Sequence, residues 1–164
     1  MNTRYLIIAF LIFGLNAQAQ VATITGKVVA VADGDTFTLL VNGSRQQKIR
    51  LHGIDCPEKK QDFGQVAKDF TSRQVFGKTI TVKPTDTDRY GRTIAIVLLP
   101  DQVSLNELLL KNGLAWHYTQ YDKNPHWYKL EQIARKNKVG LWRQPNAVAP
   151  WTFRHTKRNA YNTN

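Results

Sequence analysis

The chain has 164 residues, with 23 Lys and Arg against 12 Asp and Glu, which gives a formal net charge of +11. This is the length of a single domain, which can bury a core without cross-links, and the lone cysteine, Cys56, excludes an internal disulfide. The positive charge favours a polyanionic partner (nucleic acid, anionic lipid or acidic polysaccharide), although a basic surface that only keeps the protein soluble is the alternative.

The first segment has the pattern of a secretory signal peptide. Met1 to Arg4 is positive, Tyr5 to Leu15 is apolar, and Ala17-Gln18-Ala19 is a small-x-small cleavage site. A retained membrane helix is the alternative, but the apolar run is shorter than the roughly 20 residues that cross a bilayer. We therefore expect residues 1–19 to be removed and the protein to be exported, periplasmic or secreted, without stable membrane association.

The next segment predicts three consecutive antiparallel strands. Thr25 to Val31 is rich in β-branched residues, and the Asp33-Gly34-Asp35 turn leads into a second strand over Thr36 to Val41. Asn42-Gly43 is a strong hairpin signal, and Gln47 to Leu51 forms the returning strand. These residues predict a β-meander.

The middle of the chain alternates between helical and strand periods. Apolar residues recur at helical spacing over Asp62 to Phe76, and Gly77 stands where a C-terminal cap belongs. Two further strands are predicted over Lys78 to Lys83 and Thr93 to Leu99, with a charged turn between them.

Two more helices are predicted before the C-terminal segment. A capping box at Ser104–Glu107 opens a short helix that ends before Gly113. Asn124-Pro125 is an N-cap followed by proline, and the helix it begins ends at Gly140. Its inward-facing residues are predicted to be Trp127, Leu130, Ile133 and Ala134.

Together these elements predict an α+β fold: a five-stranded β-barrel of the OB type with about three helices. A parallel α/β sheet is the alternative, but the opening meander disfavours it because each parallel pair needs a crossover. We assign residues 20–142 to this domain and residues 143–164 to a basic C-terminal tail with little periodicity, and we expect a monomer. After Glu131 the chain has no acidic residue.

Polar side chains gather in three clusters, each at a strand end or turn, where active groups are commonly exposed on a rigid frame. The clusters are Asp33 to Thr36, Arg50 to Glu58 and Asp88 to Arg92. Each also has an ordinary structural interpretation: an Asx turn, a solvated acidic loop and a charged hairpin tip.

The three clusters contain the parts needed to hydrolyse a phosphodiester. Carboxylates with a backbone carbonyl form a hard oxygen site suited to Ca²⁺ or Mg²⁺. Arginine forks match phosphate oxygens, and a further carboxylate can orient or deprotonate water. The residues that supply these groups are Asp35, Asp55, Arg50, Arg92 and Glu58.

The same motifs resemble those of the staphylococcal nuclease (thermonuclease, or micrococcal nuclease) family, in order and at suitable intervals. They are Asp33-Gly34-Asp35-Thr36, Arg50 through Glu58, and Asp88-Arg89-Tyr90-Gly91-Arg92, with further matches at Asn106 to Ala115 and Gly140-Leu141-Trp142. The resemblance covers about residues 22–142. It implies a calcium-dependent endonuclease that cuts DNA and RNA with little base specificity and leaves 3′-phosphate ends.

The resemblance also implies roles for individual residues. Asp35, Asp55 and the backbone carbonyl of Cys56 would bind one Ca²⁺, and Asp33 has a weaker claim as a ligand. Glu58 would hold or activate the attacking water. Arg50 and Arg92 would clamp the scissile phosphate, while Arg89 and Tyr90 would contact a neighbouring phosphate.

Three questions stay open in the sequence. Either Tyr118 or Tyr121 could take the family's nucleotide-contacting role. His52, His117, His126 and His155 lack metal-ligand spacing, so we interpret them as core or surface residues.

The main alternative function is a non-catalytic OB-fold protein that binds single-stranded nucleic acid through a basic groove and aromatic side chains. A binder of acidic polysaccharide or lipid would explain the charge but not the motifs.

Overall fold

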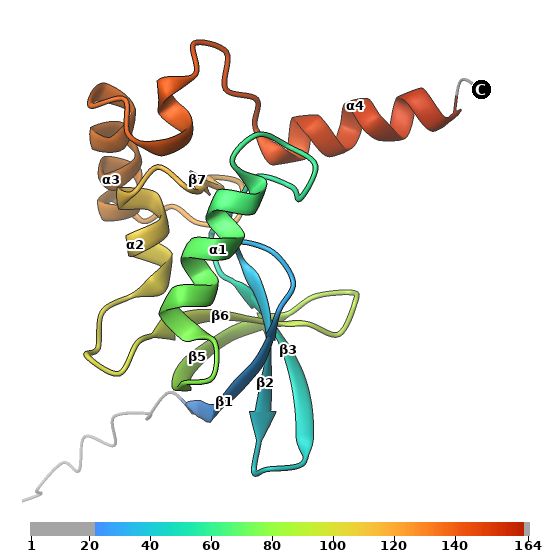
Figure 1. Ribbon diagram of the computed structural model, residues 1–164, viewed down its shortest axis with the longest axis vertical. Coiled ribbons are helices and arrows are strands. Elements are labelled where there is room, and N and C mark those ends of the chain that lie inside the picture. The colour runs from blue at the N-terminus through green and yellow to red at the C-terminus, as the bar shows by residue number, and fades with distance from the viewer. Residues whose placement is uncertain (1–21, 163–164) are drawn as a thin grey trace, which may run out of the picture.

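The computed structural model describes residues 22–162, so the predicted signal peptide at residues 1–19 lies outside the described part of the chain. A β-barrel forms one end of the molecule, α1, α2 and α3 lie at the other, and α4 projects to one side (Figure 1). Within residues 22–162, no helix combines the length and apolarity needed to cross a membrane.

Five strands form a closed barrel in the order β1-β2-β3-β6-β5, which confirms the predicted fold. The strands are β1 (Ile24–Val31), β2 (Thr36–Val41), β3 (Arg45–Leu51), β5 (Thr79–Thr87) and β6 (Thr93–Leu98). Neighbours are antiparallel except β3 and β6, which pair in parallel. A parallel pair needs a long crossover, and α1 (Gly64–Val75) together with β5 supplies it.

The interior of the barrel is filled by alternate residues of the strands. On β2, Phe37 and Leu39 are buried, and on β3, Ile49 and Leu51 are buried on either side of Arg50. Because successive strand residues point to opposite faces, Arg50 lies on the outer face of the barrel wall. The apolar interior therefore fixes the direction of a charged side chain at the end of β3.

A second, two-stranded sheet lies beside the barrel and was not predicted from the sequence. It pairs β4 (Ile54–Asp55) with β7 (Trp116–His117), so that Asp55 lies opposite Trp116. Gly53, just before β4, has φ +64, and a Cβ there would lie 2.6 Å from the Asp122 Cβ. Two-residue strands are too short to show a periodicity, so only the tertiary contacts could identify this sheet.

The helices begin and end close to the predicted positions. Helix α1 begins two residues later than predicted, because Phe63 adopts a left-handed conformation with φ 65. Helix α2 (Leu105–Lys111) is capped by Ser104, whose hydroxyl accepts a hydrogen bond from the Glu107 amide. The Glu107 side chain does not complete the predicted capping box, since it accepts a hydrogen bond from Trp127 Nε1 at 3.1 Å.

Helix α3 (Pro125–Lys136) has the predicted Asn124 cap but a different buried face. Trp127 and Ala134 are buried as predicted, whereas Ile133 is 47% exposed, so its inward assignment is wrong. Glu131 is buried instead and pairs with Arg135, which lies over the Trp142 ring. The helix therefore packs through an ion pair and aromatic rings that an apolar pattern does not show.

The C-terminal segment is more ordered than its sequence pattern indicated. The short 3₁₀ helix η1 (Gly140–Arg143) ends the predicted domain, and helix α4 (Pro150–Asn162) follows within the predicted tail. The described residues thus contain four α-helices, compared with about three predicted. Helix α4 begins with Pro150, and proline at the first position is a recognised signal for the start of a helix.

Candidate active site

The Asp33-Gly34-Asp35 turn lies directly against the Cys56 backbone and helix α1. Thr71 of α1 donates a hydrogen bond to the Gly34 carbonyl at 2.6 Å. A Cβ on Gly34 would lie 2.8 Å from the Cβ atoms of both Cys56 and Ala67, so only glycine fits here. This packing fixes the position of the buried Asp35 side chain.

Asp35 connects the first two sequence clusters. Its Oδ2 accepts a hydrogen bond from the Cys56 amide at 2.9 Å, and its Oδ1 accepts one from the Thr36 hydroxyl at 3.0 Å. The backbone amide of Cys56 therefore lies next to the Asp35 carboxylate.

Arg50 lies between the two predicted metal-binding carboxylates. Its Nη1 forms an ion pair with Asp35 Oδ2 at 2.5 Å, and its Nη2 donates a hydrogen bond to Asp55 Oδ1 at 2.8 Å. The three side chains are only 14%, 8% and 2% exposed, respectively. Asp35 and Asp55, which lie 20 positions apart, thus share the guanidinium group of Arg50.

The acidic groups differ in their proton affinities because their surroundings differ. Burial and the negative charge of Asp35 raise the pKa of Asp33 to about 7. Burial opposes ionisation of Asp35 as well, but the Arg50 charge and the Cys56 amide hold its pKa below the usual value. For Asp55 the effect of burial exceeds that of the hydrogen bonds from Arg154, so its pKa is raised.

Cys56 does not have the properties of a reactive thiol. Its side chain is buried, and burial together with the nearby carboxylates raises the pKa of the thiol well above its usual value. The thiolate is the nucleophilic form of cysteine, so this environment disfavours nucleophilic chemistry at Cys56.

The donor set fits a hard divalent cation, which would find two buried carboxylates oriented toward one positive centre. Arg50 Nη1 is buried and contacts Asp35, but the geometry of this contact is not that of a hydrogen bond. The attraction between Arg50 and Asp35 at this atom is therefore one of opposite charges. Among residues 22–162, no group of three or more His, Cys, Asp or Glu side chains is positioned to share a metal. A further ligand from another source, such as the predicted backbone carbonyl of Cys56, would complete such a site.

Glu58 lies on the loop after β4, three residues beyond Asp55. Its side chain is 39% exposed and accepts a hydrogen bond from Arg154 Nη1 at 2.7 Å. The same guanidinium binds both oxygens of Asp55, at 3.2 and 2.8 Å. Arg154 of α4 therefore joins the predicted water-activating residue to a predicted metal ligand, a contact that the sequence did not reveal.

The third cluster forms the turn between β5 and β6. Asp88 accepts hydrogen bonds from the Tyr90 and Arg92 amides and from Arg92 Nε, the last at 2.7 Å. These bonds lower the pKa of Asp88 although desolvation acts in the opposite direction. Arg89 and Arg92 lie 5.3 and 5.6 Å from the centre of the Tyr90 ring. Tyr90 itself is 72% exposed.

The parallel pairing of β3 and β6 brings Arg92 toward the face of the barrel wall that carries Arg50. Arg50 pairs with Ile94 across the parallel β3–β6 ladder, and paired residues point to the same face. Arg92 precedes Ile94 by two positions and, like it, is partly exposed. In the described part of the chain, the hydrogen bonds of Arg92 go to Asp88 and not to the Arg50 cluster.

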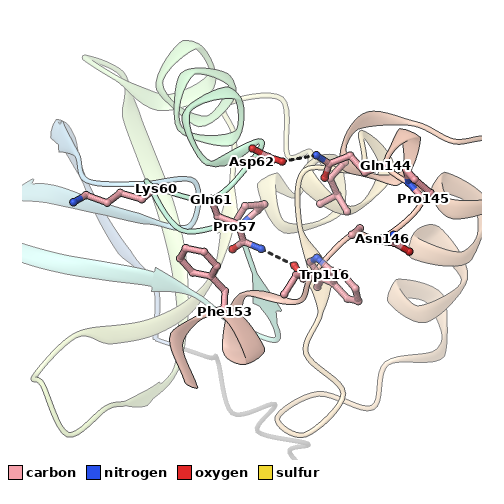
Figure 2. Close-up of a pocket in the computed structure, with 12 residues that line it drawn as sticks. Pro57, Lys60, Gln61, Asp62, Trp116, Gln144, Pro145, Asn146 and Phe153 are labelled. Carbon is pink, nitrogen blue, oxygen red and sulfur yellow. Dashed lines mark hydrogen bonds between the residues drawn. The ribbon is translucent and has the colours of Figure 1, made fainter. Parts of the chain in front are cut away.

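A cavity of about 430 Å³ lies next to this site, between the Glu58 loop and the segment leading into α4. Figure 2 shows Pro57, Lys60 and Phe153 around it, with hydrogen bonds at Gln61 and Gln144. Gln61 donates to the Val148 carbonyl at 2.6 Å, and Gln144 donates to Asp62 at 2.8 Å. The loop that carries Glu58 is therefore fastened to the C-terminal segment.

The tyrosines and histidines left open by the sequence have defined surroundings. Tyr118 stacks on Trp151 of α4, with ring centres 4.6 Å apart, whereas Tyr121 is 65% exposed. His117 is buried and forms a 2.7 Å hydrogen bond with Asp122, which also contacts His52 at 3.3 Å. These contacts agree with the structural interpretation of both histidines.

The closed five-stranded barrel with its helices defines the protein as an α+β domain of the OB type. A family model described as staphylococcal nuclease homologue matches residues 48–144. The chain therefore belongs to the staphylococcal nuclease family, and this membership supports a nuclease.

Individual relatives agree with this membership. The chain is 43% identical over 136 residues to a protein named uncharacterized endonuclease from Escherichia coli O157:H7, covering 83% of this chain and 88% of that protein. It is 38% identical over 152 residues to a micrococcal nuclease from Shigella flexneri, covering 86% of each chain. It is 41% identical over 115 residues to a staphylococcal-like nuclease from Arabidopsis thaliana, covering 70% of this chain and 35% of that protein.

Proposed function

We propose that this protein is a calcium-dependent endonuclease that hydrolyses phosphodiester bonds of DNA and RNA with little base specificity and leaves 3′-phosphate ends. The observation that carries the proposal is the contact of one buried guanidinium, Arg50, with both Asp35 and Asp55. A protein that only bound nucleic acid would gain nothing from two buried carboxylates beside a phosphate-binding arginine.

The ion would be held by Asp35, Asp55 and the Cys56 carbonyl. Bound there, Ca²⁺ would supply positive charge where negative charge develops on the phosphate. The two carboxylates now share Arg50, so an ion that took over their neutralisation would leave the guanidinium fork able to bind phosphate oxygens. Arg50 would thus exchange one type of anionic partner, the carboxylates, for another, the phosphate.

Glu58 is the group proposed to orient and deprotonate the attacking water. It is more exposed than Asp35 and Asp55, as a carboxylate that contacts solvent water must be. Proton transfer by a positioned carboxylate commonly contributes about 10²–10⁴-fold to a rate.

Arg92 is proposed to bind the same phosphate from the adjacent strand. Its backbone amide and its Nε are both bonded to Asp88, which limits the directions its guanidinium can take. Arg89 and the exposed Tyr90 belong to the same turn, and we propose that they contact the next part of a bound strand.

Export is part of the proposal and has a physical basis. Calcium sites of extracellular modules can be as weak as about 10⁻⁴–10⁻³ M and still be filled outside the cell. A signal peptide over residues 1–19 would deliver the protein to the periplasm or the medium, where such a site is occupied. A protein found at full length in the cytoplasm would contradict this part of the proposal.

The test is hydrolysis by the purified mature protein. Single-stranded DNA, duplex DNA and RNA are each incubated with Ca²⁺, with Mg²⁺ or with a chelator, and the product ends are labelled to detect 3′-phosphates. Activity should require Ca²⁺ and should fall by about 10²–10³ in Arg92→Ala, the usual cost of removing one preorganised donor.

Arg45→Ala is the matched control for Arg92→Ala. Arg45 is exposed at the opposite end of β3 from Arg50, so this variant loses the same charge away from the site and should keep its activity. Binding without cleavage under every condition would favour the non-catalytic alternative and refute the proposal.

A further inference from the structure

Helix α4 places a cation on the carboxylates that the proposed calcium site needs. Arg154 binds both oxygens of Asp55 and one oxygen of Glu58, whereas Arg50 binds only one oxygen of Asp55. A guanidinium fork across both oxygens occupies the edge of the carboxylate that a divalent ion would approach. Arg154 and the ion therefore compete for Asp55.

The helix is docked through one end only. Trp151, in its first turn, stacks on Tyr118 with an interplanar angle of 14° and meets Trp116 edge-on at 5.6 Å. From Arg154 to Asn159 every residue is exposed, and the helix projects beyond the rest of the molecule (Figure 1). One ion-pair cluster and two aromatic contacts thus hold the first turns of the helix against the domain.

These contacts are of a kind that can be exchanged. The Arg154 side chain is 42% exposed, so its guanidinium can return to solvent at little cost when another cation takes its place beside Asp55. A Trp–Tyr stack at the surface can likewise separate without exposing a core. Asp55, by contrast, is only 2% exposed, so its carboxylate needs a cation whichever partner is present.

We propose that α4 is a latch over the nuclease site: Arg154 holds it closed in the cation-free protein, and binding of a divalent cation releases it. The proposal rests on the cation site of the proposed function. Only open molecules bind the ion, so the apparent affinity falls in proportion to the fraction of molecules that are open. A closed latch therefore raises the calcium concentration at which the site fills.

The test measures calcium binding to the mature chain by isothermal titration calorimetry at fixed salt. It needs no nuclease assay. Arg154→Gln removes the competing cation. Trp151→Ala loosens the helix but leaves every charge in place. Both should bind Ca²⁺ about 5–10-fold more tightly than the wild type, the low end of typical coupling between two sites. Circular dichroism checks that each variant is folded.

Arg158→Gln is the matched control. Arg158 lies one turn further along the exposed part of α4, so this variant loses the same charge without losing a bond to Asp55, and its affinity should stay within about twofold of wild type. In the wild type, Ca²⁺ should also shift the tryptophan emission, and Trp151→Ala should abolish that shift.

The outcomes separate the latch from the site beneath it. Tighter binding by Arg154→Gln but not by Trp151→Ala would mean that Arg154 acts only through its charge, and would overturn the latch. Equal affinities in all four proteins, or no emission change, would overturn it too while leaving the calcium site intact. If none of the proteins bound Ca²⁺, the latch and the proposed calcium dependence would both fail.

Discussion

Arg50 should support the fold as well as the chemistry, and its replacement by alanine tests both. The substitution removes a guanidinium that is 14% exposed from contact with carboxylates that are 8% and 2% exposed. Breaking a buried ion pair by removing one partner costs about 3–5 kcal/mol, because the remaining charge is left uncompensated.

The structure places Arg50→Ala at the low end of this range. Asp55 keeps Arg154, and Asp35 keeps its hydrogen bonds from the Cys56 amide and the Thr36 hydroxyl. We therefore expect a loss of about 3 kcal/mol in the free energy of unfolding. At about 2–4 °C per kcal/mol for a domain of this size, the melting temperature should fall by about 6–12 °C.

The assay is urea or thermal unfolding in chelator and again in Ca²⁺, with Arg45→Ala as control. An exposed substitution such as Arg45→Ala should stay within about 0.5 kcal/mol of wild type. Calcium should stabilise Arg50→Ala more than the wild type, because the ion would replace the positive charge that Arg50 supplies to Asp35 and Asp55. If Arg50→Ala were as stable as wild type in chelator, or gained no more from calcium, the idea that Asp35 and Asp55 share one cationic centre would be wrong.

Three further changes test other parts of the site. Glu58→Gln should lower the cleavage rate by about 10²–10⁴ in single-turnover assays without weakening calorimetric calcium affinity, because Glu58 is not a proposed ligand and the change weakens only a contact of Arg154. Burial opposes ionisation of Asp122, but its hydrogen bond with His117 holds the pKa of the carboxyl below the ordinary value of 3.8. Ionised Asp122 therefore stabilises the fold fully at pH values above 3.8, and this stabilisation is lost as the pH falls through the lowered pKa. Asp122→Asn should therefore cost about 1.5–3 kcal/mol in unfolding experiments at pH 6, a difference that shrinks toward pH 3. Gly34→Ala should reduce both stability and calcium affinity, since its Cβ would force the turn away from Cys56; calorimetry and thermal melts showing wild-type values would exclude this clash.

Much of the fold follows from local pattern. The β-branched runs, the Asn42-Gly43 hairpin and the caps at Ser104 and Asn124 each act within a few residues, so the five barrel strands and the starts of three helices lie close to where they were predicted, although α3 ends at Lys136 and not at Gly140. The candidate site residues were also identified from the sequence, because the chemistry of phosphodiester hydrolysis requires carboxylates and arginines and these occur at three turns.

What the sequence did not show depends on contacts between distant segments. The β4–β7 sheet joins residues about 60 positions apart, and each of its strands has only two residues. The buried face of α3 follows from the pairing of Glu131 with Arg135 against Trp142, an arrangement that polar residue types do not predict.

Arg154 is the clearest case of a role decided by tertiary structure. In the sequence it is one of several basic residues in a segment without acidic ones, and nothing near it in the chain identifies its partners. Residues that contact each other over 96 and 99 positions can be recognised only when the fold brings them together. The sequence by itself determined the barrel, most of its helices and the chemical types present at the site. Only the tertiary structure decided which carboxylates share Arg50 and that the C-terminal helix covers two of the acids with a third arginine, because long-range packing sets those partners.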